Sequence, residues 1–159
     1  MSNNQCFILE SVLGKDLTGE ECTLFMELGT VRELKDAELL IEEGAVDNSL
    51  HIVIDGNLAV TRQVAGGDWV TLHVLRKGEL AGELGFIDGL EHSASLRAMG
   101  PAKVFSLSRA KFDPMLETNP HLVFSIMRAI IRGVHNTLRR MNQQQIEMNN
   151  YIMRQHGRY

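Results

Sequence analysis

The stretch GELAGELGFIDGLEHSASLRA, residues 78–98, contains too much glycine for a regular helix or a regular strand. The glycines in this stretch are Gly78, Gly82, Gly85 and Gly89. Glycine allows the backbone to turn sharply or to approach a ligand closely. If a short helix begins at Glu83, the free N–H groups of its first turn face an anion. The residues alone leave two interpretations open, an anion-binding loop or a glycine-rich corner of a β-barrel.

The polar groups in this stretch suit the parts of a phosphorylated sugar. The carboxylate of Glu83 can accept hydrogen bonds from sugar hydroxyls. The hydroxyl of Ser93 and the backbone N–H of Ala94 can each donate to a phosphate oxygen. His92 stands directly before Ser93, at a place where an anion would favour a stronger cation.

The sequence around the stretch predicts several short strands. The segments rich in strand-forming residues are 38–41, 50–54, 57–62, 69–75 and 102–107. Turn signals separate them at Glu43-Gly44, Asp55-Gly56, 66–68, Lys77-Gly78 and Gly100-Pro101. Short strands at a spacing of roughly 8–12 residues are typical of a sandwich or a barrel. Trp69 follows the turn at 66–68, so we expect it to pack on the barrel.

Helices are predicted at both ends of the chain. Thr18 and Glu21 have the spacing of a capping box, which indicates a helix within the first 29 residues. A short helix over 109–117 is followed by Asn119-Pro120, and a proline suits the first turn of the next helix. That last helix, over 121–155, would be roughly 50 Å long.

The last helix carries a heptad pattern. Its apolar seam consists of Ile131, Val134, Leu138, Met141, Met148 and Ile152, with Gln145 as one polar position. A small barrel cannot cover a helix of this length, so the outer half needs a partner. We expect a homodimer through 121–155, and the alternative is a helix that packs only on its own domain.

The composition indicates a globular protein of the cytoplasm. Hydrophobic residues make up 44% of 159 residues, and the formal net charge of -4 lacks the basic surplus of a nucleic-acid binder. We see no signal peptide and no apolar run that could span a membrane. Cys6 and Cys22 are expected to be reduced thiols. No zinc, nucleophile-elbow or Walker motif is present, so an enzyme is not expected.

Residues 82–94, GELGFIDGLEHSA, resemble the phosphate-binding cassette of the cyclic nucleotide-binding domain family. They are most similar to the catabolite activator branch, whose cassette runs Gly-Glu-Leu-Gly, a short variable stretch, and Arg-Ser-Ala. The resemblance covers most of the chain and implies an α+β fold. In this fold an eight-stranded antiparallel jelly-roll barrel (double-stranded β-helix) is flanked by helices and followed by a long dimerisation helix. We expect the jelly-roll domain over 1–119 and the long helix over 120–159.

The resemblance also implies roles for individual residues. Gly82 resembles the cassette glycine, and Glu83 matches the glutamate that accepts the ribose 2′-hydroxyl. Leu84 matches a residue whose backbone lies at the ribose and phosphate, while Ser93 and Ala94 match the pair that contacts phosphate oxygens. Relatives place polar groups against the base on the long helix, and Thr137 falls there. His135 or Asn136, which lie next to Thr137, could contact the base instead. Alternatively, Thr137 lies on a solvent-exposed helix face and has no role in binding.

His92 departs from the family pattern, which has an arginine that pairs with the cyclic phosphate. Histidine side chains in general are mostly uncharged at neutral pH. Loss of a charge-assisted hydrogen bond in a partly buried site costs on the order of 1.5–3 kcal/mol, or roughly 10- to 200-fold in affinity. The ligand is therefore bound weakly, bound with a dependence on pH, or is a different one. Relatives often carry an arginine at the position of Arg97 too, so we expect a structural role for it.

Two functions follow from these observations. The first is a stand-alone regulatory module that binds cyclic AMP (cAMP), cyclic GMP (cGMP) or a related small anion and signals through its dimer helix to an unknown protein partner. The second is a degenerate domain that binds no cyclic nucleotide and serves as a scaffold for dimerisation or protein interaction. The family's transcription factors have a DNA-binding domain after the long helix. This chain ends at Tyr159, so we expect no direct contact with nucleic acid.

Overall fold

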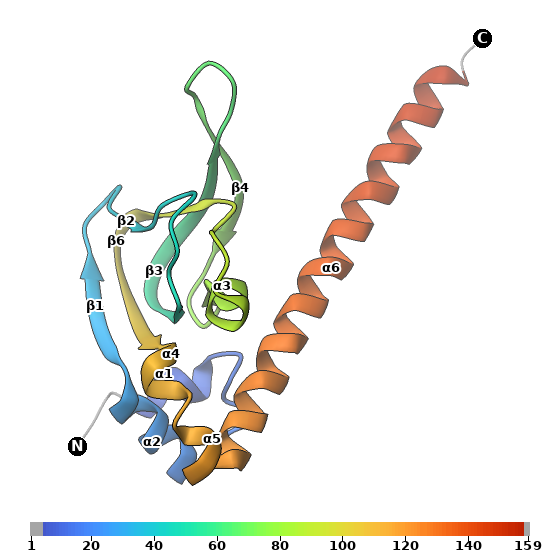
Figure 1. Ribbon diagram of the computed structural model, residues 1–159. Helices are drawn as coiled ribbons and strands as arrows, with labels where there is room; N and C mark the ends of the chain where they lie inside the picture. Colours follow the sequence, from blue (N-terminus) through green and yellow to red (C-terminus); the bar gives the residue numbers. More distant parts are fainter. Residues whose placement is uncertain (1–4, 158–159) are drawn as a thin grey trace.

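The computed structural model describes residues 5–157 and shows a small β-barrel, a group of short helices beneath it, and one long helix (Figure 1). The helices are α1 (Gln5–Glu10), α2 (Gly19–Leu28), α3 (Glu83–Asp88), α4 (Arg109–Phe112), α5 (Met115–Thr118) and α6 (Pro120–His156). The strands are β1 (Thr30–Leu34), β2 (Leu39–Ile41), β3 (Ser49–Gln63), β4 (Trp69–Leu75), β5 (Leu80–Ala81) and β6 (Ser95–Ser108).

All strand pairs are antiparallel, in the order β1-β6-β3-β4, with β2 paired to β6 and β5 paired to β3. The long strands β3 and β6 pair along almost their whole length, from Ser49↔Ser108 to Thr61↔Ser95. This bent pair forms the centre of a jelly-roll-like barrel. The fold class predicted from the sequence is confirmed.

Two of the predicted turns are wrong. Asp55-Gly56 lies inside β3, and Gly100-Pro101 lies inside β6, so the segments 50–54 and 57–62 are one strand. The ladder shifts its register between Val53 and Asn57, where the two strands bend together. Gly56 has φ +76°, and a Cβ there would lie 2.5 Å from the Pro101 carbonyl oxygen. Gly56 therefore allows a β-bulge within one strand and does not mark a turn. The described residues form six strands, whereas eight were expected.

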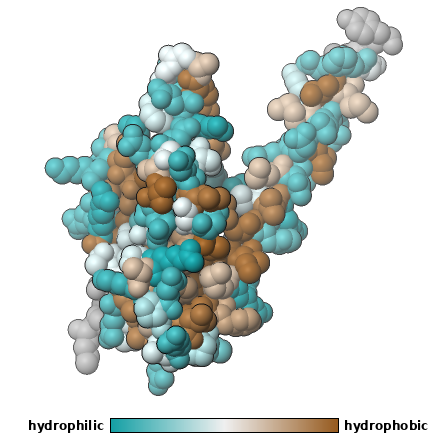
Figure 2. Space-filling model, viewed as in Figure 1, coloured by the Kyte–Doolittle hydropathy of each residue, from teal (hydrophilic) through white to brown (hydrophobic). Residues whose placement is uncertain are grey.

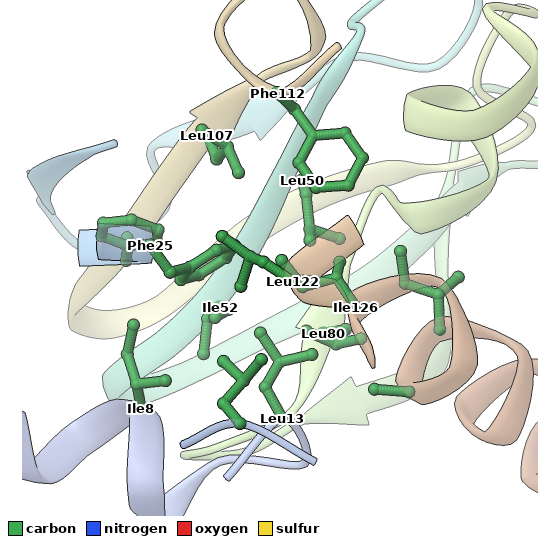
Figure 3. Close-up of a cluster of buried hydrophobic side chains, with 14 of the residues drawn as sticks. Ile8, Leu13, Phe25, Leu50, Ile52, Leu80, Leu107, Phe112, Leu122 and Ile126 are labelled. Atoms are coloured by element: carbon green, nitrogen blue, oxygen red, sulfur yellow. The ribbon is translucent and has the colours of Figure 1, made fainter. Parts of the chain in front are cut away.

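The main core lies between the barrel and the helices. Leu50 and Ile52 of β3 point into it together with Leu122 and Ile126 of α6, as Figure 3 shows. Phe25 of α2 completes this cluster with Phe105 of β6, at a ring-centroid distance of 5.3 Å. A second, smaller cluster fills the barrel and consists of Leu34, Val53, Leu58, Ala98, Ala102 and Val104.

The capping box predicted for the N-terminal region is present at the start of α2. The Thr18 hydroxyl accepts from the Glu21 N–H, and the Glu21 carboxylate accepts from the Thr18 N–H. Glu21 also pairs with His121 at the base of α6. Cys22 is a buried free thiol, whereas the side chain of Cys6 lies outside the described part of the structure.

The helix α6 changes its surroundings along its length. Its first turns are buried in the core through Leu122, Ile126 and Ile130, and Arg132 forms a two-bond ion pair with Asp16 at 2.9 and 3.1 Å. Arg140 makes one further contact, with His73 of β4, and the outer part of the helix stands away from the body (Figure 2). The outer seam residues are exposed, namely Leu138, Met141, Met148 and Ile152. None of the helices described for residues 5–157 has the length and apolar character needed to cross a membrane.

Candidate functional site

The glycine-rich stretch forms a tight turn into α3. Gly82 follows β5 in the left-handed conformation, with φ +71°, and Glu83 begins the helix. A Cβ at Gly82 would lie 3.1 Å from the Ser49 carbonyl oxygen and 3.3 Å from Cδ2 of His51. Both the backbone conformation and the close approach therefore call for glycine here. The helix ends at Gly89, which is also left-handed and donates its N–H to the Gly85 carbonyl.

Glu83 is the half-buried acid of this site. It lies in the first turn of α3, where the helix dipole favours a negative charge. Burial raises the pKa of its carboxyl above the ordinary value of 4.5, and its own backbone N–H and the charge that His92 can carry offset only part of this rise. Leu84, the next residue, has an exposed side chain, which leaves its backbone as the candidate contact.

His92 is held against the wall of the site. Its Nε2 lies 3.1 Å from the backbone carbonyl oxygen of Asp47. Its backbone pairs with the preceding loop, since its N–H donates to Ala45 at 2.9 Å and its carbonyl accepts from Gly44 at 2.8 Å. The ring packs on Gly85, where a Cβ would lie 2.7 Å from Cε1 and Nε2 of His92. The loop before β3, α3 and His92 thus form one packed unit.

Ser93 and Ala94 lie at the end of the cassette, directly before β6. Ser93 is exposed and Ala94 is half-buried. The following residue, Ser95, is fully buried, and its hydroxyl accepts from the Glu43 N–H at 2.8 Å. This bond fixes the point at which the cassette joins the barrel.

Of the three candidates on α6, Thr137 faces the domain. It is half-buried, and its hydroxyl donates to the Gly133 carbonyl at 3.1 Å, whereas His135 and Asn136 are exposed. One turn further on, Arg140 lies 3.1 Å from Nε2 of His73 on β4. Burial and this arginine lower the pKa of His73. The contact extends the attachment of α6 beyond the core, on the same side as Thr137.

Sequence reasoning missed a partly buried polar cluster beneath the cassette, formed by the buried His51 with Asp47 and Ser106. The His51 ring bonds to the Asp47 carboxylate through Nε2 at 2.8 Å and to the Ser106 hydroxyl through Nδ1 at 2.7 Å. Burial alone would raise the pKa of the Asp47 carboxyl. The bond and charge of His51, a bond from the Ser49 side chain and the charge of His92 together hold that pKa below the ordinary value of 3.8. The one available signal was a lone histidine inside the apolar run of β3.

Arg97 and Trp69 form a pair outside the cassette. The Arg97 guanidinium lies over the Trp69 ring, 5.3 Å from its centroid. Trp69 is exposed, so it contacts an arginine of β6 and not the barrel interior that we expected. The stacking is in keeping with a structural role for Arg97, which stays a prediction. Among residues 5–157 no group of histidine, cysteine or acidic side chains is arranged to hold a metal ion.

Comparison with known proteins agrees with this geometry. The sequence pattern of the family described as "Cyclic nucleotide-binding domain" matches residues 31–119, more than half of the chain. The cAMP-activated global transcriptional regulator of Salmonella typhimurium is 28% identical over 127 residues, which cover 79% of this chain and 60% of that regulator. A cAMP-dependent protein kinase regulatory subunit of Dictyostelium discoideum is 26% identical over 82 residues, 50% of this chain and 25% of that subunit. The chain thus spans less than two thirds of these relatives.

Solved structures share the fold. A cyclic nucleotide-binding domain from Methylobacillus flagellatus superposes with a TM-score of 0.83 at 21% identity, covering 91% of this chain and 83% of that one. The catabolite activator protein of Thermus thermophilus gives a TM-score of 0.71 at 24% identity, covering 86% of this chain and 64% of that one. With the match over 31–119, these likenesses show that the chain belongs to the cyclic nucleotide-binding domain family.

Proposed function

We propose that this chain is a regulatory sensor module that binds cAMP, cGMP or a related small anionic ligand at the cassette and signals through α6. The observation that carries the proposal is Glu83, a half-buried carboxylate in the first turn of α3, in a cassette of this family. A buried acceptor beside free helix N–H groups suits a ribose hydroxyl next to a phosphate. Ser93 and Ala94 supply the donors at the other end, and Thr137 supplies a polar group from α6.

The core offers a route from the cassette to α6. Phe86 of α3 is buried in the same cluster as Leu122 and Ile126 of α6. In our proposal a ligand draws Glu83 and Ser93 inward, changes the packing of α3 on α6, and shifts the population between two arrangements of the long helix. An unidentified protein partner would read this arrangement.

We further propose that two copies of the chain pair through residues 121–155. The exposed seam supports pairing, and the positions beside it carry no acidic or lysine or arginine side chains that would repel in a parallel pair. These flanking residues are His135, Thr137, Asn142, Gln144, Asn149 and Tyr151. The acidic balance of the chain favours a protein partner over direct contact with nucleic acid. The buried free thiol of Cys22 is in keeping with a cytoplasmic location.

A second candidate function is a scaffold with an unused pocket. The observation that favours it is the hydrogen bond of His92 to the Asp47 carbonyl, which holds the only cation candidate of the cassette against the wall. Such a protein would dimerise without binding any cyclic nucleotide.

Calorimetric titration with cAMP and cGMP at pH 6 and pH 8 separates the two functions, with 5′-AMP as the non-cyclic control. The wild-type chain and His92→Arg are compared. The sensor proposal expects binding by both, with His92→Arg roughly 10- to 200-fold tighter at pH 8 because an arginine carries a permanent charge. Binding by His92→Arg alone would mean an intact pocket adapted to another ligand. No detectable binding by either protein would support the scaffold function.

A further inference from the structure

The two ring nitrogens of His92 have different surroundings. Nε2 lies 3.1 Å from the Asp47 carbonyl oxygen. A carbonyl oxygen can only accept a hydrogen bond, so Nε2 must carry a hydrogen. Nδ1 has no hydrogen-bond partner among residues 5–157. In the neutral ring Nδ1 is then the bare nitrogen, which can accept a hydrogen bond and cannot donate one.

The partner of Nε2 is itself fixed in place. The Asp47 carboxylate accepts from the Ser49 N–H at 3.1 Å and bonds to His51, whose side chain is only about 5% exposed. The other ring nitrogen of His51 is anchored to Ser106 on β6. This partly buried cluster holds Asp47, and therefore its carbonyl, at the position where His92 meets it.

The ring of His92 is also restrained from the other side. Gly85 lies so close that a Cβ there would come within 2.7 Å of the ring. A flip of the ring about its axis would exchange Nε2 for Cε1 and lose the bond to Asp47. The packing therefore selects one orientation, and the hydrogen bond selects one neutral form.

We infer that the Asp47 carbonyl keeps neutral His92 in the Nε2–H form, so that the cassette binds an anion at His92 only together with one proton. This inference rests on the proposed function, because it concerns the same site. The bare Nδ1 of the neutral ring repels an anionic oxygen. When Nδ1 takes up a proton from solvent, the ring becomes a cation with a second N–H that can donate to that oxygen. The proton returns to solvent when the anion leaves. A neutral ligand with a hydroxyl or amine donor has the opposite preference.

The charged groups around His92 lie on α3, on the loop before β3 and on β3 itself. Glu83 of α3 and the Asp47 carboxylate both interact electrostatically with His92. His51 of β3 lies behind Asp47 and can itself carry a charge. Both carboxylates favour a positive ring, and they also oppose an incoming anion. Charging His92 thus compensates for the acidic surroundings of the cassette.

The form of the ring can be measured without any ligand. Two-bond ¹⁵N–¹H correlation spectra of the wild-type chain at pH 8 distinguish the two neutral forms of each histidine, and His92→Gln assigns the signal of His92. We expect the Nε2–H form. A predominant Nδ1–H form would overturn the inference, whatever the chain binds.

Proton uptake can be measured by titrating cAMP into the wild-type chain at pH 7.5 in two buffers that differ in their enthalpy of ionisation. We expect uptake approaching one proton per bound cAMP, and an affinity that falls by up to about tenfold per pH unit as the pH rises from 6 to 8. The control His92→Arg should bind with no uptake from this position. Equal wild-type affinity at pH 6 and pH 8 with no uptake would overturn the inference and leave the proposed function intact. Failure of both the wild-type chain and His92→Arg to bind at any pH would instead refute the proposed function.

Discussion

Ionised Glu83 lowers the free energy of unfolding of the protein. Its pKa is raised above 4.5, mainly by burial, so the folded chain holds this proton more tightly than the unfolded chain does. Ionisation of Glu83 therefore destabilises the fold as the pH rises above this range. The residue is poorly placed for stability and well placed to accept hydrogen bonds from a ligand.

The substitution Glu83→Gln tests whether ionised Glu83 destabilises the fold. The neutral amide removes the penalty, so we expect a larger free energy of unfolding than wild type at pH 7. Below about pH 4 the gain should vanish, since wild-type Glu83 is then protonated in both states. Urea unfolding at pH 3.5, 5 and 7 measures the difference. An equal gain at every pH would mean that packing, and not charge, causes it.

Gly85 is the second residue on which the cassette depends. In Gly85→Ala the new methyl group meets the His92 ring at 2.7 Å and the Asp47 carbonyl oxygen at 3.1 Å. One of these groups must move, so we expect a loss of about 1–3 kcal/mol in the free energy of unfolding. Thermal and urea unfolding measure the loss, and the spectrum of His92 should shift with it. An unchanged stability would show that the packing around His92 is loose.

The residues of the cassette could be named from the sequence because they are contiguous and carry a specific pattern. The position of the His92 ring could not, since it depends on Asp47, 45 positions earlier. The bonds of His51 could not be predicted either, because Ser106 reaches it only through the pairing of β3 with β6. Local sequence indicates which residues are candidates for a site, and long-range pairing decides where their atoms lie.

At the scale of the element, α6 contains a glycine in its interior. A Cβ at Gly133 would have no atom within 4 Å. Alanine favours the helix over glycine by about 0.5–1 kcal/mol, so Gly133→Ala should stabilise the chain by roughly this amount. Urea unfolding measures the change, and Gly85→Ala is the matched control with the opposite expected sign. A destabilised Gly133→Ala would indicate that another chain packs against this position.

The strands show why glycine and proline are ambiguous signals. Gly56 and Pro101 mark the bend that β3 and β6 share, and the same residues would have served a turn equally well. The long helix was easier to predict, because its apolar residues repeat over several heptads and a few irregular positions do not hide that repeat. Pattern length, more than composition, determined which elements could be predicted.

For the whole molecule, the exposed seam of α6 is the feature that a single chain does not explain. Leu138 is 53% exposed although it belongs to the most regular apolar row of the sequence. The row predicted from the sequence is present, and pairing through it stays a prediction.

Leu138→Gln tests the pairing. We expect the wild-type chain to dimerise and the variant to dissociate at concentrations at least about tenfold higher, because the seam loses a central apolar contact. Sedimentation velocity over a range of concentrations measures both. Asn150→Ala, on the opposite side of the helix, should behave as wild type. A wild-type chain that stays monomeric at every concentration would refute the proposed dimer.

The helix α6 has a buried base and an exposed outer part, so a small rotation at the base moves the far end by a larger distance. The base is fixed by the core up to Ile130 and by the contact of Arg140 with His73, while residues 141–156 extend beyond it. At about 1.5 Å per residue this arm is roughly 24 Å long. A tilt of about 10° at the base therefore displaces the far end by about 4 Å. In the proposed signalling, a side-chain adjustment too small to alter the barrel would become a movement of several ångströms at His156.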